Sequence, residues 1–538
     1  MKLVTVEEMR AVEKEANAAG MSYETMMDNA GRGLARIVAE TYSQLDEKVV
    51  LGLVGVGNNG GDTLVALAEL KREGWRTLAY LSRARKPEDA LVLAYLQTGG
   101  ELTTAEDDPK MEILDRWLRS AGLLLDGLLG TGVQPPLKPD VADLLEHVRR
   151  FQPSPRVVAV DCPSGVDCDS GQAAAQTLTA ELTVCMQAVK TGLLRFPAYA
   201  LVGELMVVDL GLPEPLAGWN SLPREVVSGE RVKSILPTRP INAHKGSFGT
   251  AVVAAGSLNY TGAALLAGRG AYRMGAGLVR LAVPAPLHGV LAGQLPEATW
   301  VLLPHKMGVI AEAAAEVLLK NLDRAGALLL GPGWGTDETT GKFLKTLLEG
   351  RRERSGRAGM GFLNPQDTTD EEEPRQSLPP VVVDADGLRL LAQLTDWPHL
   401  LPPNAVLTPH PGEMAALCGM EVSEIQQERV LVAERFAQEW GHVLVLKGAL
   451  TVVASPDGRT GVVPIATPAL ARAGSGDVLA GFITGLRAQG LPAYEAALAG
   501  AWLHAQCGLQ AEDWLGSSAS VLAGDLIEVL PEVLRWLQ

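Results

Sequence analysis

The sequence predicts an α/β protein with two domains, each built on a mainly parallel sheet flanked by helices. Short apolar runs such as 49–54 and 381–383 recur through both halves, and each ends in a loop of Gly, Pro or polar residues. A proline-rich stretch over 214–240 has no clear periodicity and separates the two series. We therefore expect one domain over 1–215 and a second over 222–538.

Composition excludes several classes of partner. A chain of 538 residues is too long for one ordinary core, and its 58 glycines suit α/β domains with many tight loops. The formal net charge of −16 argues against nucleic acid and anionic membranes, which require a basic surface. Any phosphate-bearing ligand must be held locally, by backbone amides and a few lysines.

Cysteine usage and the N-terminus predict a cytoplasmic protein. None of the cysteines forms a CxxC pair, so we expect reduced thiols and no structural zinc. The first residues contain no apolar segment of signal-peptide type, and apolar runs elsewhere are too short or too broken to span a membrane. The five cysteines are Cys162, Cys168, Cys185, Cys418 and Cys507.

The first domain begins with helices over 5–42, where Thr5 and Glu8 form a capping box. Strand 49–54 then leads through a glycine loop, 55–62, into a helix over 63–72. This strand, loop and helix form the first unit of a Rossmann-like, doubly wound sheet. A helix over 87–98 is also expected. Further strands are expected at 77–81, 123–126, 157–161, 178–186 and 205–209, about six in all.

Three of these strands end in loops that carry Asn59, Asp126 and Ser164. The carboxyl ends of parallel strands meet at one crevice, where ligands bind. An amide oxygen, a carboxylate and a hydroxyl suit a hard cation such as K⁺, Na⁺ or Mg²⁺. The spacing is equally typical of three capped helix starts, and both interpretations stay open at this point.

The second domain repeats the pattern after residue 244. We expect a helix over 262–274, and a single crevice that collects the polar loops following each strand. The charged stretch 351–379 departs from the pattern, and we interpret it as a mobile surface insertion without assigned function. The expected strands are 250–255, 278–283, 327–330, 381–383, 405–407 and 443–446.

A glycine loop near the C-terminus carries the chemistry of this domain. Gly474, Ser475 and Gly476 precede Asp477, and an apolar helix follows. Glycine-bent amides and a helix N-terminus can bind a phosphate, while Asp477 in the first turn can take a proton from a hydroxyl. This arrangement suits phosphoryl transfer to an alcohol. A simple N-cap and turn would give the same residues.

The motifs together resemble the family of bifunctional NAD(P)H-hydrate repair enzymes, in which an N-terminal epimerase is fused to a C-terminal ribokinase-like dehydratase. Each motif is weak alone, but they occur in family order on both halves and cover nearly all of the chain outside 351–379. The N-terminal motifs are GNNGGD (57–62), LLGTG (128–132) and DCPSGVD (161–167). The C-terminal motifs are HKG (244–246), GPGWG (331–335), DADG (384–387), TPHPGE (408–413), LKGA (446–449) and AGSGD (473–477).

The resemblance implies repair of a damaged cofactor. Reduced nicotinamide can take up water at its 5,6 double bond, and the hydrate forms as R and S epimers. The first domain would interconvert the epimers of NADHX and NADPHX. The second would dehydrate the S form with ADP or ATP and Mg²⁺, and the resemblance does not choose between the nucleotides. Asp477 would take the proton from the hydroxyl as that hydroxyl attacks the terminal phosphate.

The resemblance also implies the site residues of the dehydratase. Ala276, Gly335, His410 and Asp477 would contact the hydrate. From the residues alone, His410 is as well explained by a satisfied helix start, and Lys447 by a lysine at a strand end. Nucleotide contacts would come from Lys447, Gly448, Ala449, Leu450, Thr451 and Gly476.

In the epimerase, the resemblance implies that Asp161 lies against the nicotinamide ring and gives acid–base help, with Lys190 a weaker candidate. Asn59, Asp126 and Ser164 match the K⁺ ligands. Thr63, Arg472 and Ser475 depart from the usual family residues, and Arg472 would influence nucleotide affinity. Substrate-binding residues would be Asn58, Asn59, Gly60, Gly61, Asp62, Gly130, Thr131, Gly132, Val133, Gln134, Pro135, Pro136 and Asp161.

Two other functions fit parts of the sequence. A ribokinase-type small-molecule kinase with a regulatory first domain shares the Gly-Ser-Gly-Asp loop, and would be distinguished by a stable phosphorylated product. The first domain could also be a nucleotide-binding scaffold without activity. We expect NAD(P)HX and ADP or ATP as the small-molecule partners, and a homo-oligomeric assembly.

Overall fold

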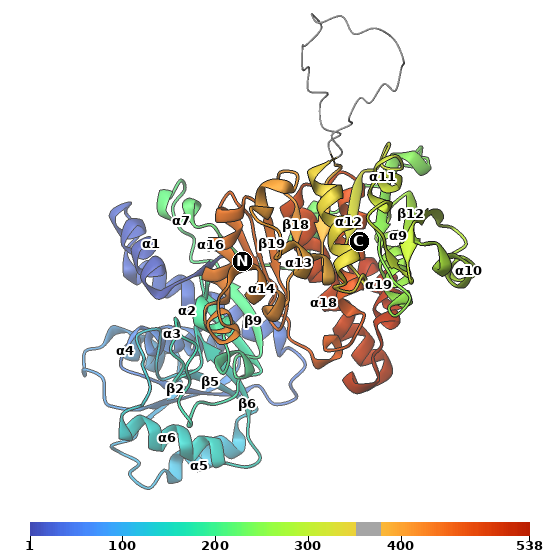
Figure 1. The fold of residues 1–538 in the computed structure, drawn as a ribbon. Coiled ribbons are helices and arrows are strands. Elements are labelled where there is room, and N and C mark those ends of the chain that lie inside the picture. The colour runs from blue at the N-terminus through green and yellow to red at the C-terminus, as the bar shows by residue number, and fades with distance from the viewer. Residues whose placement is uncertain (351–377, 538) are drawn as a thin grey trace, which may run out of the picture. The chain divides into compact units, whose positions relative to one another are not determined.

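A computed structural model describes residues 1–350 and 378–537, and the chain separates into two compact units, Met1–Val226 and Val227–Gln538 (Figure 1). Both units contain parallel sheets with helices packed against them, which confirms the predicted α/β class. The interpretation of 351–379 as a mobile insertion falls outside the described residues, apart from its last two positions. No helix in the described ranges is long and apolar enough to cross a membrane.

The first unit has a seven-stranded sheet in the order β4-β3-β2-β5-β6-β7-β9, and all its neighbours pair in parallel. The order reverses between β2 and β5, which is the topological switch of a doubly wound fold. One strand more than expected is present, because the short and partly polar β4 gives no apolar run. The bounds are β2 Val49–Val54, β3 Arg76–Leu81, β4 Glu101–Thr104, β5 Leu123–Gly127, β6 Arg156–Val160, β7 Leu182–Met186 and β9 Glu204–Val208.

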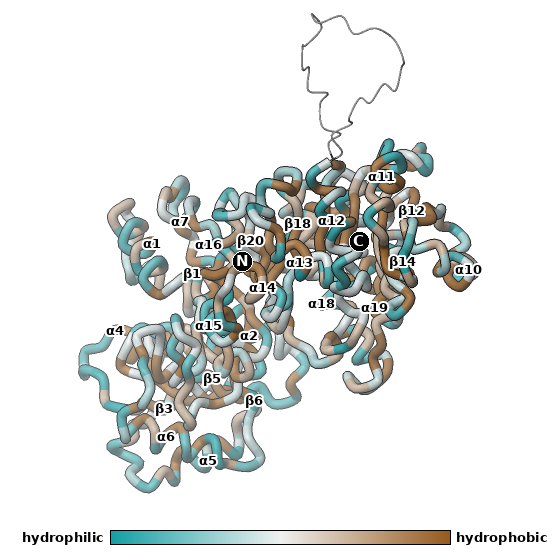
Figure 2. Tube along the Cα trace, in the orientation of Figure 1, coloured by the Kyte–Doolittle hydropathy of each residue, from teal (hydrophilic) through white to brown (hydrophobic). Residues whose placement is uncertain are grey.

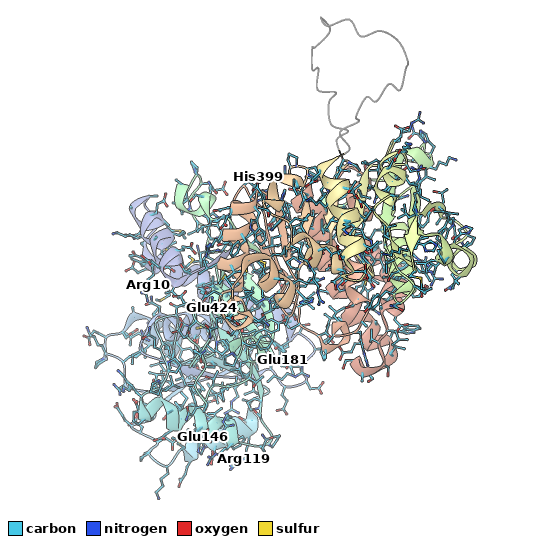
Figure 3. All side chains as sticks on the ribbon, viewed as in Figure 1. Arg10, Arg119, Glu146, Glu181, His399 and Glu424 are labelled. Atoms are coloured by element: carbon cyan, nitrogen blue, oxygen red, sulfur yellow. The ribbon has the colours of Figure 1, made fainter. Side chains whose placement is uncertain are left out.

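Helices cover both faces of this sheet. One core cluster joins it to α2, α3 and α4, and another joins it to α5 and α6. Figure 2 shows the apolar strands inside, and Figure 3 shows Arg119 of α5 and Glu146 of α6 projecting from the helices. The bounds are α1 Val6–Ala18, α2 Tyr23–Thr41, α3 Asn58–Arg72, α4 Ala90–Gln97, α5 Glu112–Ser120 and α6 Pro139–Arg150.

Helix α3 begins at Asn58, five residues earlier than the sequence predicts, so most of the glycine loop is helical. Close approach of the backbone explains Gly55 and Gly60. A Cβ on Gly60 would lie 2.0 Å from the carbonyl oxygen of Gly55, so only glycine allows the helix to start against the turn that follows β2. The amides of the first turn therefore lie at the edge of the sheet where ligands bind.

The second unit contains the strand order β21-β20-β19-β18-β17-β16-β11-β12-β13, parallel except for the antiparallel pairs of β20 with β19 and β21. Strands 327–330, 381–383 and 443–446 occur as predicted. The bounds are β11 Thr250–Ala254, β12 Leu278–Pro284, β13 Thr299–Leu303, β16 Ala327–Leu330, β17 Val381–Val383, β18 Val406–Leu407, β19 Val443–Leu446, β20 Val452–Ala454 and β21 Thr460–Val462.

One face of this sheet shares its core with α9, α17, α18 and α19. Helices α9 and α17 pack very closely, since a Cβ on Gly481 would lie 2.3 Å from the carbonyl oxygen of Ala267. The bounds are α9 Thr261–Arg273, α11 Ala314–Leu319, α12 Glu338–Glu349, α13 Asp386–Leu391, α14 Pro411–Cys418, α16 Arg429–Trp440, α17 Ser475–Ala488, α18 Ala493–Leu515 and α19 Ala523–Leu537.

Short elements complete the two units. In the first, β1 pairs in parallel with β8 and so fixes the start of α1. In the second, β14 and β15 form a small antiparallel hairpin. The bounds are β1 Leu3–Val4, β8 Val189–Lys190, α7 Ala217–Ser221, β10 Arg224–Val226, α8 Gly229–Ile235, α10 His288–Leu291, β14 His305–Lys306, β15 Val309–Ile310 and α15 Val422–Gln427.

Candidate active sites

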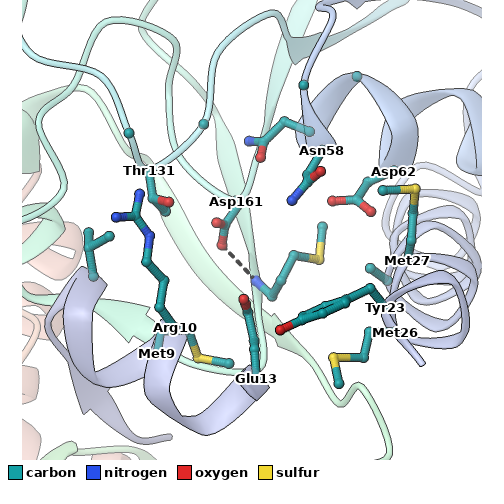
Figure 4. Close-up of a pocket in the computed structure, with 18 of the residues that line it drawn as sticks. Met9, Arg10, Glu13, Tyr23, Met26, Met27, Asn58, Asp62, Thr131 and Asp161 are labelled. Carbon is teal, nitrogen blue, oxygen red and sulfur yellow. Dashed lines mark hydrogen bonds between the residues drawn. The ribbon is translucent and has the colours of Figure 1, made fainter. Parts of the chain in front are cut away.

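The first unit contains a cavity of about 770 Å³ at the carboxyl ends of its strands (Figure 4). Its walls come from α1, α2, the first turns of α3 and the loops after β5 and β6, with Lys190 of β8 inside. Methionines and a tyrosine form the apolar part, and carboxylates with two cations form the polar part. This mixture suits a ligand that has both a ring and charged groups.

Most of the predicted epimerase residues line this cavity, and four do not. Gly61 faces the sulfur of Met27 in the packing of α3 on α2, and Gln134, Pro135 and Pro136 lie outside the lining. The predicted residues in the lining are Asn58, Asn59, Gly60, Asp62, Gly130, Thr131, Gly132, Val133 and Asp161.

Asp161 and Lys190 form a buried ion pair inside the cavity. Asp161 has φ 64°, a left-handed conformation, and its Oδ1 accepts hydrogen bonds from the Met186 amide at 2.9 Å and from the Lys190 ammonium. The ammonium also donates to the carbonyl oxygen of Met186 at 3.1 Å. Burial lowers the pKa of Lys190, but the Asp161 carboxylate outweighs this effect and the net pKa is raised. Lys190, the weaker candidate in the sequence, is therefore charged and fixed.

Two further carboxyl groups face this pair. Burial, together with the negative charge of Asp161, raises the pKa of Asp62 well above its usual value. Burial also raises the pKa of Glu13 on α1, with an opposing effect from Lys190. The cavity thus combines a carboxylate that is paired with a lysine and two carboxyl groups whose pKa values are raised by burial.

Asp126 and Ser164, two of the residues proposed as cation ligands, are in direct contact. Asn59 of the cavity wall joins them through Leu129, whose carbonyl oxygen accepts from the Asn59 side-chain amide at 3.2 Å and whose amide donates to the Ser164 hydroxyl at 3.0 Å. Asp126 is fully buried, and its two carboxylate oxygens accept from the Ser164 hydroxyl at 2.5 Å and the Ser164 amide at 2.8 Å. A Cβ on Gly130 would lie 2.4 Å from the Asn59 amide oxygen. In the described part of the chain, no Lys, Arg or His forms an ion pair with Asp126, and burial raises its pKa. A buried carboxylate without a cationic side chain fits a bound cation.

In the second unit, three neighbouring strands end in charged residues that meet around Lys447. Its ammonium lies 2.6 Å from Asp384 Oδ1, after β17, and 3.6 Å from Glu413 Oε2, after β18. Thr408 also donates to Asp384 Oδ1 at 2.7 Å. Burial lowers the pKa of Lys447, but the two carboxylates raise it further, so the lysine stays charged.

His410 belongs to the same cluster through Glu413. Its Nε2 lies 3.1 Å from Glu413 Oε1, and its Nδ1 accepts from the amides of Gly412 and Glu413 at 3.0 and 3.3 Å. The ring therefore caps α14, as the satisfied-histidine alternative predicts, and it also stays half-exposed beside the cluster. The structure thus confirms the capping interpretation of His410, and its contact with the hydrate stays a prediction.

Asp477 lies in the first turn of α17, as predicted. Burial raises its pKa to about 7; Asp384 and Asp386 raise it as well, and Lys447 lowers it. A Cβ on Gly476 would lie 3.5 Å from the Lys447 ammonium, which places the lysine over the glycine loop. A carboxyl group with a pKa near neutrality is suited to act as a general base.

Gly335 is close to this cluster and Ala276 is not. The Gly335 amide donates to Asp386 Oδ2 at 2.8 Å. Ala276 is buried in the core. Its neighbour Gly275 lies next to Gln489, since a Cβ on Gly275 would be 3.0 Å from that side chain, and Gln489 is at the C-terminal end of α17. Twelve residues of helix separate that end from Asp477, which is about 18 Å. Ala276 precedes its strand, whereas the other predicted residues follow theirs.

The predicted nucleotide loop, residues 447–451, connects β19 to β20. Thr451 donates to the Gly448 carbonyl oxygen at 2.8 Å. Behind the loop, the Arg429 guanidinium donates to the carbonyl oxygens of Leu446 at 2.8 Å and Lys447 at 3.2 Å. Burial lowers the pKa of Arg429 to about 10. Arg472 donates to the carbonyl oxygen of Ala519.

Sequence reasoning missed several residues of both sites. Asp384, Asp386 and Glu413 lie inside motifs quoted for the family, so their charge could have been noted. Glu13 and Arg10 of α1 gave no signal beyond the apolar spacing of a helix.

Comparisons with known proteins cover both units. The family model described as NAD(P)H-hydrate dehydratase matches residues 251–353 and 359–532, and the model described as YjeF-related protein N-terminus matches 23–192. The bifunctional NAD(P)H-hydrate repair enzyme Nnr of Moorella thermoacetica is 36% identical over 100% of this chain and 97% of its own length.

The chain belongs to the bifunctional NAD(P)H-hydrate repair enzyme family. Another member of this family, from Escherichia coli, is 32% identical over 98% of this chain and 93% of its own length. Among solved structures, the ADP/ATP-dependent NAD(P)H-hydrate dehydratase from Bacillus subtilis, co-crystallised with ATP and Mg²⁺, is 30% identical. It covers 58% of this chain and 98% of its own, with a TM-score of 0.45.

Proposed function

We propose that this protein repairs hydrated NADH and NADPH. The first unit interconverts the R and S epimers of NAD(P)HX, and the second converts the S epimer to NAD(P)H with ADP or ATP as phosphate donor. The observation that carries the proposal is the family match along the whole chain, on both units. The chemistry of the two residue clusters supports it.

In the second unit, Asp477 takes the proton of the C6 hydroxyl of the hydrate. That oxygen attacks the terminal phosphorus of the nucleotide, and AMP leaves when the donor is ADP. The C6–O bond then breaks, since phosphate is a better leaving group than hydroxide, and loss of a proton from C5 restores the 5,6 double bond. A pKa of about 7 for Asp477 supports this role as base.

The glycine loop and Lys447 bind the phosphates in this proposal. Amides of 474–477 at the start of α17 stabilise the charge of the transferred group, and the loop 447–451 contacts the AMP part. Gly335 and His410 contact the hydrate. We leave Ala276 out of the proposed site because it lies at the other end of α17.

In the first unit, the amides of 58–62 and 130–133 hold the substrate phosphates, and Asp161 gives acid–base help at the ring. The ion pair with Lys190 holds the Asp161 side chain in place within the cavity. Their shared cavity with Glu13 and Asp62 is the feature that supports epimerase chemistry over a passive scaffold.

We further propose that K⁺ binds to Asn59, Asp126 and Ser164, where it would neutralise the buried Asp126 carboxylate and stabilise the loops around the cavity. Mg²⁺ has no preformed site, since the described residues contain no group of three His, Cys, Asp or Glu that could hold a metal ion. It would accompany the nucleotide phosphates, which is its usual mode of binding. The five unpaired thiols support a cytoplasmic location, and we propose a homo-oligomer.

Incubating the protein with mixed hydrate epimers and ADP or ATP tests both activities. We expect full recovery of the absorbance of the reduced nicotinamide, with release of phosphate. A stable phosphorylated alcohol would indicate a kinase instead. Recovery of only the S fraction would contradict the epimerase.

A further inference from the structure

Helix α1 forms one wall of the epimerase cavity, although it precedes the sheet and belongs to none of the family motifs. Its residues Val6, Met9, Arg10 and Glu13 all line the cavity. The spacing of three, four and seven residues puts them on one face of the helix.

The position of α1 is fixed next to Lys190. The pairing of β1 with β8 sets Val4 beside Lys190, and the helix begins two residues later. A capping box between Thr5 and Glu8 defines the first turn, and the Val6 amide donates to Asp169 Oδ1 at 2.8 Å. The cavity-facing side of α1 is thus held to the same strand that carries Lys190.

Glu13 is the residue of this face that can both donate and accept a proton. Its side chain points into the cavity toward the Asp161–Lys190 pair (Figure 4). Within the described residues, Glu13 has no hydrogen-bond or ion-pair partner, whereas Asp161 is held by two donors. A carboxyl group that points into a ligand cavity and is held by no protein group is available to a ligand.

Epimerisation at C6 by loss and re-addition of water needs one group that donates a proton and another that accepts one. The hydroxyl must be protonated to leave one face of the ring, and a water molecule must be deprotonated as it adds to the other face. Asp161 can supply only one of these functions at a time, and it is already paired with Lys190. Pairs of carboxyl groups with different environments commonly divide acid and base roles.

We propose that Glu13 is the second acid–base residue of the epimerase and acts with Asp161; the inference rests on the proposed function. The protonated Glu13 donates to the C6 hydroxyl, the C6–O bond breaks with the electrons on oxygen, and the lone pair of N1 forms an N1=C6 iminium as water leaves. A solvent water molecule then adds to the opposite face of C6, its oxygen forming the new bond and its proton passing to Asp161. The reverse reaction uses the two groups in exchanged roles, so no other reactant is consumed.

The charges around Glu13 agree with a proton donor. Burial and the Asp161 carboxylate raise its pKa, while Lys190 and Arg10 lower it, with a net upward shift. Asp62 from α3 also faces the group, and Tyr23 and Glu24 of α2 line the same cavity. Burial raises the pKa of Asp62 well above its usual value, whereas Asp161 is the carboxylate that is paired with Lys190.

The test compares Glu13→Gln with Glu7→Gln, which changes an exposed glutamate on the same helix. Epimer interconversion is measured without nucleotide, from R-NADHX to S-NADHX, across a pH series and in H₂¹⁸O. In the wild type we expect a bell-shaped pH profile and uptake of ¹⁸O at C6. Glu13→Gln should lower the rate about a hundredfold or more, and remove the alkaline limb that reports a proton donor. Glu13→Asp should restore part of the rate.

Two controls accompany this comparison. Dehydration of S-NADHX by the same variant must stay at the wild-type rate, which shows that the second unit is intact, and R-NADHX must still bind. Wild-type interconversion in Glu13→Gln, or an unchanged alkaline limb, overturns the role of Glu13. If the wild-type protein itself fails to interconvert the epimers, the proposed epimerase is wrong, and not only this residue.

Discussion

The pH dependence of the dehydratase provides the sharpest test of the second site. Asp477 has a pKa of about 7 because it is buried beside Asp384, and Lys447 opposes this shift. A general base acts in its ionised form, so activity should rise as pH increases through this value. With saturating nucleotide, kcat/KM for S-NADHX at pH 6 should be about tenfold below its plateau at higher pH.

Two substitutions should move this acid limb in opposite directions. Asp384→Asn removes a negative charge, which lowers the pKa of Asp477 and shifts the limb to lower pH. Lys447→Met removes the positive charge and shifts it to higher pH. A shift of one pKa unit corresponds to about 1.4 kcal/mol, and we expect shifts of roughly this size. Asp477→Asn should abolish the limb and lower the rate about a hundredfold or more.

The assay is the initial rate of NADH formation across a pH series, at nucleotide concentrations shown to saturate each variant. A limb that both charge substitutions leave in place, or that both move in one direction, would refute the assignment.

The raised pKa of Asp477 also affects the stability of the fold. The folded value exceeds the usual 3.8, so Asp477 stabilises the fold less as pH rises from about 4 to about 7.

Three further predictions concern other positions. Gly60→Ala places a Cβ 2.0 Å from a backbone oxygen and should cost about 1–3 kcal/mol, seen as a lower Tm, whereas Gly57→Ala, with nothing within 4 Å, should change Tm little. Arg429→Met removes two hydrogen bonds to the nucleotide loop and should raise the nucleotide KM about tenfold with kcat retained; an unchanged KM contradicts a positioning role. K⁺ should raise the Tm of the wild type but not of Asp126→Asn, and an equal response in both argues against the cation site.

Periodicity and motifs predict the parts of this fold that rest on local chemistry. Buried parallel strands such as 381–383 are recognised in the sequence as short apolar runs. The glycines before Asp477 and the apolar segment after it predict that Asp477 lies in the first turn of a helix. The ELTT segment of β4 has too few apolar residues to be recognised. The sequence places the start of α3 five residues too late, because glycines indicate a loop unless the close contact of Gly60 with Gly55 is known.

The candidate sites show where sequence reasoning stops. Loops after parallel strands converge by topology, so Asn59, Asp126 and Ser164 could be grouped before any coordinates. Glu13 could not, because only the pairing of β1 with β8 brings α1 to the cavity. Ala276 is the opposite case, since this motif position precedes its strand and lies by the end of α17 that is far from Asp477.

The position of Lys447 has a consequence for nucleotide binding. The Lys447 ammonium compensates the charges of Asp384, which follows β17, and Glu413, which follows β18. It also lies over the glycine loop. An incoming phosphate competes for the same cation and brings negative charge near Asp477, whose pKa of about 7 is held down by Lys447, so nucleotide binding should be accompanied by proton uptake. Calorimetric titrations of ADP should therefore give an apparent heat that varies with the ionisation enthalpy of the buffer.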